Sequence, residues 1–288
     1  MTIRRAALFI ITGVITLLAV VVIVNAPAIA AGALLHPYKW GTDKAPPAGC
    51  SDTTFEGVGG VRLRGWTCTP RHGARGTLVY LHGVADNRGS GSGVVQRFVN
   101  RGLDVVAYDS RAHGDSDGDV CTYGYYEKQD LQRIFTALQR DRVVLLGHSL
   151  GAAVALQTAA DDPRVIGVVA VESFSDLRMV AGERAFYLPG FLVERAFKYA
   201  EEKGVFDTSA VSPVKAAPRI KVPVLVIHGT ADDATSPEHS KRIYAALPGP
   251  KELLLVEGAR HAGSLARGDV WDAIDKWVDD VIETASKE

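Results

Sequence analysis

Hydrophobic positions fall into two kinds of segment that alternate along most of the chain after residue 76. Short, nearly continuous apolar runs rich in Val, Leu and Ile are typical of strands buried on both faces. Longer segments with apolar residues three to four positions apart indicate helices. The expected strands are 77–83, 104–110, 142–149, 165–173, 222–229 and 251–258. The expected helices are 93–101, 124–139, 150–160 and 266–285.

This alternation predicts an α/β protein with a mostly parallel central sheet and helices on both of its faces. In front of it, "TTFEG" and "VRLRGWTC" flank Gly59 and Gly60 and predict an N-terminal antiparallel hairpin.

One long interruption separates the strand ending at residue 173 from the strand starting at residue 222. Within it, the segment at about 176–215 is helical in pattern and rich in aromatic residues. A connection this long inside a compact domain is usually functional. We therefore expect a small helical cap over the sheet, and expect Phe186, Phe191 and Phe197 mostly to pack this cap onto the body.

The start of the chain follows a different pattern. The 19 residues from Ala6 to Val24 carry no charge and are apolar on every face. At about 1.5 Å per residue they span close to the ~30 Å hydrocarbon core of a bilayer. Arg4 and Arg5 precede them, so the positive-inside rule predicts a cytoplasmic N-terminus and an extracytoplasmic body.

The expected organisation is a transmembrane anchor over residues 1–25, a linker over 26–50 and one globular domain over 51–288. A cleaved signal peptide, leaving a secreted protein, is the alternative, because "APAIAAG" at 26–32 offers small-residue cleavage sites. The apolar stretch is longer than the roughly 7–15 residues typical of a signal peptide, which favours the anchor.

The composition argues against some classes of function but does not indicate one by itself. The net charge is -1 and no long basic run is present, so nothing favours a nucleic-acid partner. The three cysteines have no spacing typical of a metal site. A three-residue loop centred on Gly59 would place Cys50 opposite Cys68 and permit a disulfide, whereas a two-residue turn would offset them; three free thiols are the alternative. The oligomeric state is not predicted.

Candidate chemistry gathers where strands end, as expected for an open α/β sheet. The polar residues there are His82, Asp109, Ser149, Glu172, Asp232 and His261. Ser149 lies in "LLGHSLGAAV", directly between an apolar strand and a small-residue helix, which is the context of a nucleophile elbow. "GDSDG" around Ser116 matches the same G-x-S-x-G pattern, but it lies in a polar loop with no strand directly before it.

A serine hydroxyl needs a base, and an imidazole base needs a carboxylate that holds its tautomer. His261 follows the last strand and is the expected base; His148 is excluded because its side chain should face away from Ser149. Asp232 is the expected acid, ahead of Asp233 and then Asp176.

Two backbone amides are the expected oxyanion donors. The Leu150 amide is fixed by the turn at the nucleophile, and the Val84 amide lies in the loop after the strand at 77–83.

The set "LHGVADN", "DSRAHGDS", "GHSLGA", "HGTADDATSP" and "GARHAG" resembles the α/β-hydrolase superfamily, in its esterase and serine-peptidase-like branch, over about residues 53–285. The resemblance implies a Ser149–Asp232–His261 triad, an oxyanion hole at Val84 and Leu150, a helical cap, and no cofactor or metal. One departure is Ala112, where such proteins often carry Gly.

The expected activity is hydrolysis of a carboxylic ester, taken from a small-molecule ester or acyl substrate. A peptidase or acyltransferase of the same fold is the first alternative. A membrane-tethered binding protein without catalysis is the second, and the presence of all three triad residues disfavours it.

Overall fold

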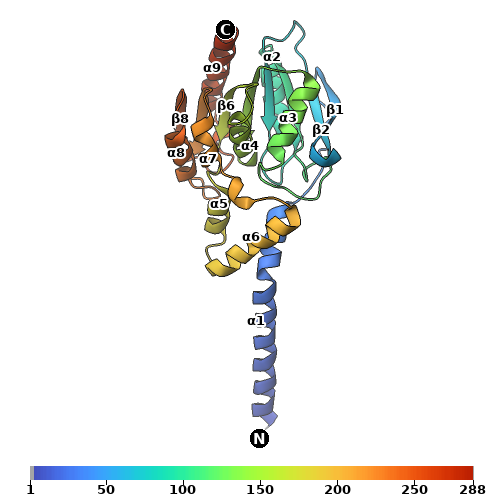
Figure 1. Ribbon diagram of the computed structural model, residues 1–288, viewed down its shortest axis with the longest axis vertical. Helices are drawn as coiled ribbons and strands as arrows, with labels where there is room; N and C mark the ends of the chain where they lie inside the picture. Colours follow the sequence, from blue (N-terminus) through green and yellow to red (C-terminus); the bar gives the residue numbers. More distant parts are fainter. Residues whose placement is uncertain (1–2, 288) are drawn as a thin grey trace.

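The computed structural model describes residues 3–287 and contains an eight-stranded sheet in the order β1-β2-β4-β3-β5-β6-β7-β8 (Figure 1). β1 and β2 form an antiparallel hairpin, β2 is antiparallel to β4, and β3 to β8 run parallel. The predicted mostly parallel sheet with an N-terminal hairpin is therefore confirmed. The strands are β1 Cys50–Glu56, β2 Arg62–Cys68, β3 Thr77–Leu81, β4 Asp104–Tyr108, β5 Val143–His148, β6 Val165–Val171, β7 Val224–Gly229 and β8 Lys251–Val256.

Helices cover both faces of the sheet, because successive strand residues point to opposite sides and both sets are apolar. On β3, Val79 and Leu81 join one buried cluster, whereas Leu78 and Tyr80 join the other. The first cluster is covered by α3 Glu127–Leu138, α4 Leu150–Ala159 and α8 Pro237–Ala246. The second is covered by α2 Ser92–Asn100 and α9 Gly268–Ala285.

The region expected as a cap contains α5 Leu177–Arg184, α6 Gly190–Gly204 and the single turn α7 Pro213–Ala216. Phe197 is buried, and the guanidinium of Arg178 on α5 lies over its ring. Phe186 and Phe191 are instead 85% and 70% exposed, so the expectation that they pack the cap onto the body is wrong. Both lie at or just after the turn between α5 and α6, where the chain projects from the body.

The N-terminal segment forms one helix, α1 Ile3–Leu35, so residues 26–35 are helical rather than part of a linker. Residues 10–35 contain an 18-residue window with a mean hydropathy of 2.5 and form a helix long and apolar enough to cross a membrane or to serve as a signal sequence. The end of α1 packs along α6, and Ala31 and Leu35 are buried in the core of the body. Two body groups cap its last carbonyls: the Tyr123 hydroxyl donates to Leu34 and the Cys121 amide to Leu35.

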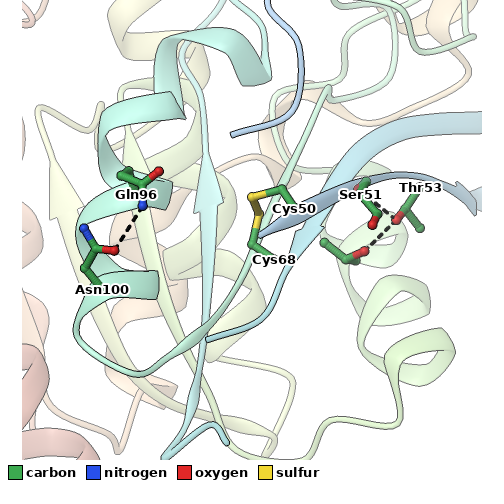
Figure 2. Close-up of a disulfide and its surroundings, with 7 residues drawn as sticks. Cys50, Ser51, Thr53, Cys68, Gln96 and Asn100 are labelled. Atoms are coloured by element: carbon green, nitrogen blue, oxygen red, sulfur yellow. Dashed lines mark hydrogen bonds between the residues drawn. A yellow bond between two sulfur atoms is a disulfide. The ribbon is translucent and has the colours of Figure 1, made fainter. Parts of the chain in front are cut away.

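The hairpin register pairs Cys50 with Cys68, and the two residues form a disulfide at the end of the hairpin away from its loop (Figure 2). The register follows from a hydrogen bond from the Gly57 amide to the Val61 carbonyl, which closes a three-residue loop centred on Gly59. Gly59 has φ +75°, a conformation that glycine adopts without steric cost. The disulfide hypothesis is thus confirmed, and Cys121 is a buried free thiol.

Replacing both Cys50 and Cys68 with Ala is expected to lower the free energy of unfolding by about 3 kcal/mol, because the bridge closes a loop of 18 residues in the unfolded chain. Urea unfolding of the full chain in detergent measures this difference. Reduction of the disulfide in the wild-type protein should lower the free energy of unfolding by a similar amount, which is seen as a lower urea midpoint. An unchanged midpoint in both experiments would contradict the expectation.

Candidate active site

Ser149 sits in the sharp turn between β5 and α4, with φ +52° and ψ −112°. A non-glycine residue with positive φ is strained, and such strain is held only where the surroundings enforce it. The two flanking glycines make the turn possible. A Cβ at Gly147 would lie 2.3 Å from the Gly151 carbonyl oxygen, and a Cβ at Gly151 would lie 2.1 Å from that of Leu81. The G-x-S-x-G pattern is therefore required by the close approach of helix and strand.

Three side chains from different loops form one hydrogen-bonded chain. The Nδ1 atom of His261 lies 2.7 Å from Asp232 Oδ2, and its Nε2 atom lies 3.2 Å from Ser149 Oγ. Because an ionised carboxylate only accepts hydrogen bonds, Nδ1 carries the proton and Nε2 is free to accept from the serine. The structure thus brings together the three residues that the sequence singled out.

Asp232 is buried at the end of β7 and holds its place through further bonds. Its Oδ1 accepts from the amides of Ala234 and Thr235, both at 2.9 Å, and His228 Nε2 lies 3.2 Å from its Oδ2. Burial alone would raise the pKa of Asp232, but the hydrogen bonds from His228, His261 and the Thr235 amide outweigh it and hold the pKa well below its usual range. The carboxylate is therefore ionised throughout the neutral range.

Glu172, at the end of β6, is a supporting residue to which the sequence gave no role. It is fully buried, has φ +55°, and accepts hydrogen bonds from the Ala262 amide and, at 2.6 Å, the Ser264 hydroxyl. These bonds fix the loop directly after His261. His148 Nε2 lies 3.1 Å from Glu172, and the His148 ring is 5.2 Å from the His261 ring, so His148 lies beside the site rather than facing away from it.

The nitrogens of His148 and His261 and a carboxylate oxygen of Glu172 lie within 4.8 Å of one another, as the ligands of a cation would. The hydrogen bonds of these three residues indicate that they position His261 instead of binding a cation. Both His261 nitrogens face Asp232 and Ser149, and Glu172 is saturated by the loop after His261. We therefore treat this group as the support of His261.

Val84 and Leu150 line the same cavity as Ser149. Within residues 3–287 neither amide donates a hydrogen bond to a protein group. Leu150 is the first residue of α4, where amide hydrogens are unpaired and the helix dipole favours negative charge. His82 fixes the loop that carries Val84: its Nε2 accepts from the Ser110 amide at 3.0 Å, so its Nδ1 donates to the Gly83 carbonyl.

The rival candidates have structural partners elsewhere. Ser116 is buried, and its hydroxyl donates to the Asp109 carbonyl and accepts from the Arg64 amide. Asp233 is exposed and paired with Arg260. Asp176 caps the start of α5.

A cavity of about 270 Å³ leads away from Ser149, close to the lower end of the ~300–1,000 Å³ typical of ligand sites. Its walls come from the cap, the body and α1, and they are mostly apolar. They include Ala30, Ala31, Leu34, Phe174, Leu177, Val180, Leu188, Val193 and Phe197.

A parallel sheet with a serine on the β5–α4 turn, and an aspartate and a histidine after β7 and β8, defines the α/β-hydrolase architecture. The sequence profile of the Alpha/beta hydrolase family matches residues 78–273, and the chain belongs to this family. Its fold is that of a hydrolase.

Three comparisons place it among relatives. It is 30% identical over 219 residues to the uncharacterized protein YqkD of Bacillus subtilis, covering 72% of each chain. Its structure is similar to the Pyrococcus furiosus esterase Pf2001, with a TM-score of 0.68, 21% identity, and coverage of 87% of this chain and 98% of that one. Proline iminopeptidase of Mycobacterium smegmatis gives a TM-score of 0.62 at 18% identity, covering 82% and 100%.

Proposed function

We propose that this protein is a serine hydrolase that cleaves carboxylic esters through an acyl-enzyme, with Ser149 as nucleophile, His261 as general base and Asp232 as the carboxylate that orients it. The hydrogen-bonded chain from Ser149 through His261 to Asp232 carries the proposal. The two unpaired amides beside it support the proposal, because a developing oxyanion needs such donors.

In the first step, Ser149 Oγ bonds to the ester carbonyl carbon while His261 Nε2 takes its proton. The amides of Val84 and Leu150 donate to the resulting oxyanion. The C–O bond to the alcohol then breaks, and His261 returns the proton to the departing alkoxide. Water attacks the acyl-enzyme with His261 again as base, which releases the carboxylic acid and restores the Ser149 hydroxyl.

The cavity favours an ester over a peptide. Among its described lining residues the single charged side chain is Arg184, and none is acidic. A substrate with a free α-ammonium group would therefore enter without a counter-charge, which is costly in an apolar site. An acyl chain matches the walls instead. The structural neighbours include both an esterase and a peptidase, so the cavity rather than the fold supports this choice.

We further propose that α1 is retained as a membrane anchor, with the N-terminus cytoplasmic and the body outside. Cleavage within 26–32 would cut α1 inside the segment that packs on the body, and cleavage after Ala31 would remove Ala30 and Ala31 from the cavity wall. A signal peptide is removed from the mature protein, so its residues are not expected to form part of the folded domain.

Labelling with a fluorophosphonate probe is expected to modify the full-length protein at Ser149, located by peptide mass spectrometry. Esters of p-nitrophenol should then be cleaved, whereas aminoacyl anilides should be poor substrates, since no acidic residue among the described cavity lining can pair with their ammonium group. Labelling at Ser116 would contradict the assignment of the nucleophile. Preference for the anilides would support the peptidase alternative, and no labelling would support a binding protein.

A further inference from the structure

The position of α1 relative to the body defines where a bilayer would lie. Side chains from Val20 to Asn25 are exposed, and burial in the body begins at Ala26 and Pro27. The apolar stretch ends at Val24, immediately before this boundary. A bilayer that surrounds the apolar part of α1 therefore has its body-side surface close to Asn25, directly against the part of the body that packs on α1.

That part of the body is the cap. In Figure 1 the start of α6 is the portion of the body that extends furthest along α1 toward the N-terminus. Phe186, Tyr187 and Phe191 lie here and are 85%, 72% and 70% exposed. The Phe186 and Tyr187 rings pack edge to face with centroids 5.7 Å apart. Three exposed aromatic side chains in six residues are unusual on a water-facing surface, whereas such residues are favoured at the surface of a bilayer.

The cavity connects this surface with the nucleophile. Its lining includes Ser149 together with Tyr187 and, from α1, Ala30 and Leu34. Tyr187 thus belongs both to the exposed aromatic group and to the cavity wall. A chain that passes between the end of α1 and the α5–α6 turn would meet apolar side chains along its path to Ser149.

We propose that the substrate is an ester with a long acyl chain that reaches Ser149 directly from the bilayer, with Phe186 and Phe191 inserted in the lipid surface on either side of the access path. The proposal rests on the proposed ester hydrolysis and adds its substrate class and direction of approach. Insertion places the cavity mouth at the depth where the ester group of a lipid lies, so the chain need not cross water.

The activity test uses the full-length protein reconstituted through α1 into phosphatidylcholine vesicles. The Phe186→Ser/Phe191→Ser variant is expected to lower kcat/KM for p-nitrophenyl hexadecanoate dissolved in the vesicles at least about tenfold, because two apolar lipid contacts are lost. Hydrolysis of water-soluble p-nitrophenyl acetate should stay within about twofold, since neither phenylalanine lines the cavity. Leu255→Ser is the matched control: Leu255 is an exposed apolar residue on β8, and its replacement should alter neither rate.

Equal losses on both esters, or no loss on the hexadecanoate, would overturn the proposal. A measurement independent of catalysis accompanies it. A nitroxide attached at Phe186→Cys should collide more often with oxygen than with a water-soluble nickel complex, and a nitroxide at Leu255→Cys should show the reverse. Equal nickel access at both positions would also overturn the proposal. Failure of the proposed function would look different: no acetate hydrolysis and no fluorophosphonate labelling, whatever the depth of the label.

Discussion

Replacing Ser149 with Ala is expected to lower kcat/KM for a p-nitrophenyl ester by at least about 10⁴-fold. The variant keeps the backbone of the turn, which depends on Gly147 and Gly151 rather than on the hydroxyl. It removes the one oxygen that His261 Nε2 can activate. The free energy of unfolding should change by less than about 1 kcal/mol, because only one partly solvated hydrogen bond is lost. Steady-state kinetics and urea unfolding measure the two effects.

Ser116→Ala is the matched control, because Ser116 carries the same local pattern in a purely structural setting. Its hydroxyl links the Asp109 carbonyl to the Arg64 amide inside the protein. This variant should keep its kcat/KM within a few-fold and lose about 1–3 kcal/mol of stability. Substantial ester hydrolysis by the Ser149 variant, or loss of activity without loss of stability in the Ser116 variant, would refute the assignment.

Asp232→Asn is expected to lower kcat/KM by about 10⁴-fold while leaving the fold intact. The asparagine carbonyl can still accept from the amides of Ala234 and Thr235. Its NH₂ group, however, donates to His261 Nδ1, which moves the imidazole proton to Nε2 and leaves no acceptor for the Ser149 hydroxyl. Asp233→Asn is the control and should keep its activity, because Asp233 is exposed and paired with Arg260.

The same variant gives a pH signature. Because the pKa of Asp232 is depressed in the folded protein, its carboxylate stabilises the fold above the unfolded pKa of about 4, and this contribution disappears as pH falls through the folded pKa. The stability difference between wild type and Asp232→Asn should be largest above about pH 5 and shrink toward pH 2. Urea unfolding at a series of pH values measures it, and a constant difference would contradict a depressed pKa.

Local sequence patterns were sufficient to predict the sheet and the surroundings of Ser149. The apolar runs that predicted β3 to β7 are buried on both faces, and the glycine spacing at 147 and 151 reflects a close contact within the same turn. Strand ends were predicted one or two residues too long, for example 104–110 against a β4 that ends at Tyr108. The residues that follow, such as Asp109, leave the ladder to bond turn amides.

Features that depend on distant contacts were not predictable. Glu172 became informative only when the end of β6 met the loop after His261, 90 residues later in the chain. The small residues of 26–32 indicated cleavage sites at the start of a linker, yet α1 continues to Leu35 and packs against α6. Phe186, Phe191 and Phe197 lie in the same aromatic-rich segment of the sequence, and the tertiary fold alone decides which of them is buried.

Because residues of α1 form part of the cavity wall, substrate preferences depend on whether α1 is present in the protein that is tested. A soluble fragment that starts at His36 would still carry Ser149, Asp232 and His261, and an active-site probe would still find its serine. It would lack Ala30, Ala31 and Leu34, so one side of the acyl cavity would be open to water. Preferences for acyl-chain length measured on such a fragment would reflect a wider and more hydrated cavity than that of the intact protein.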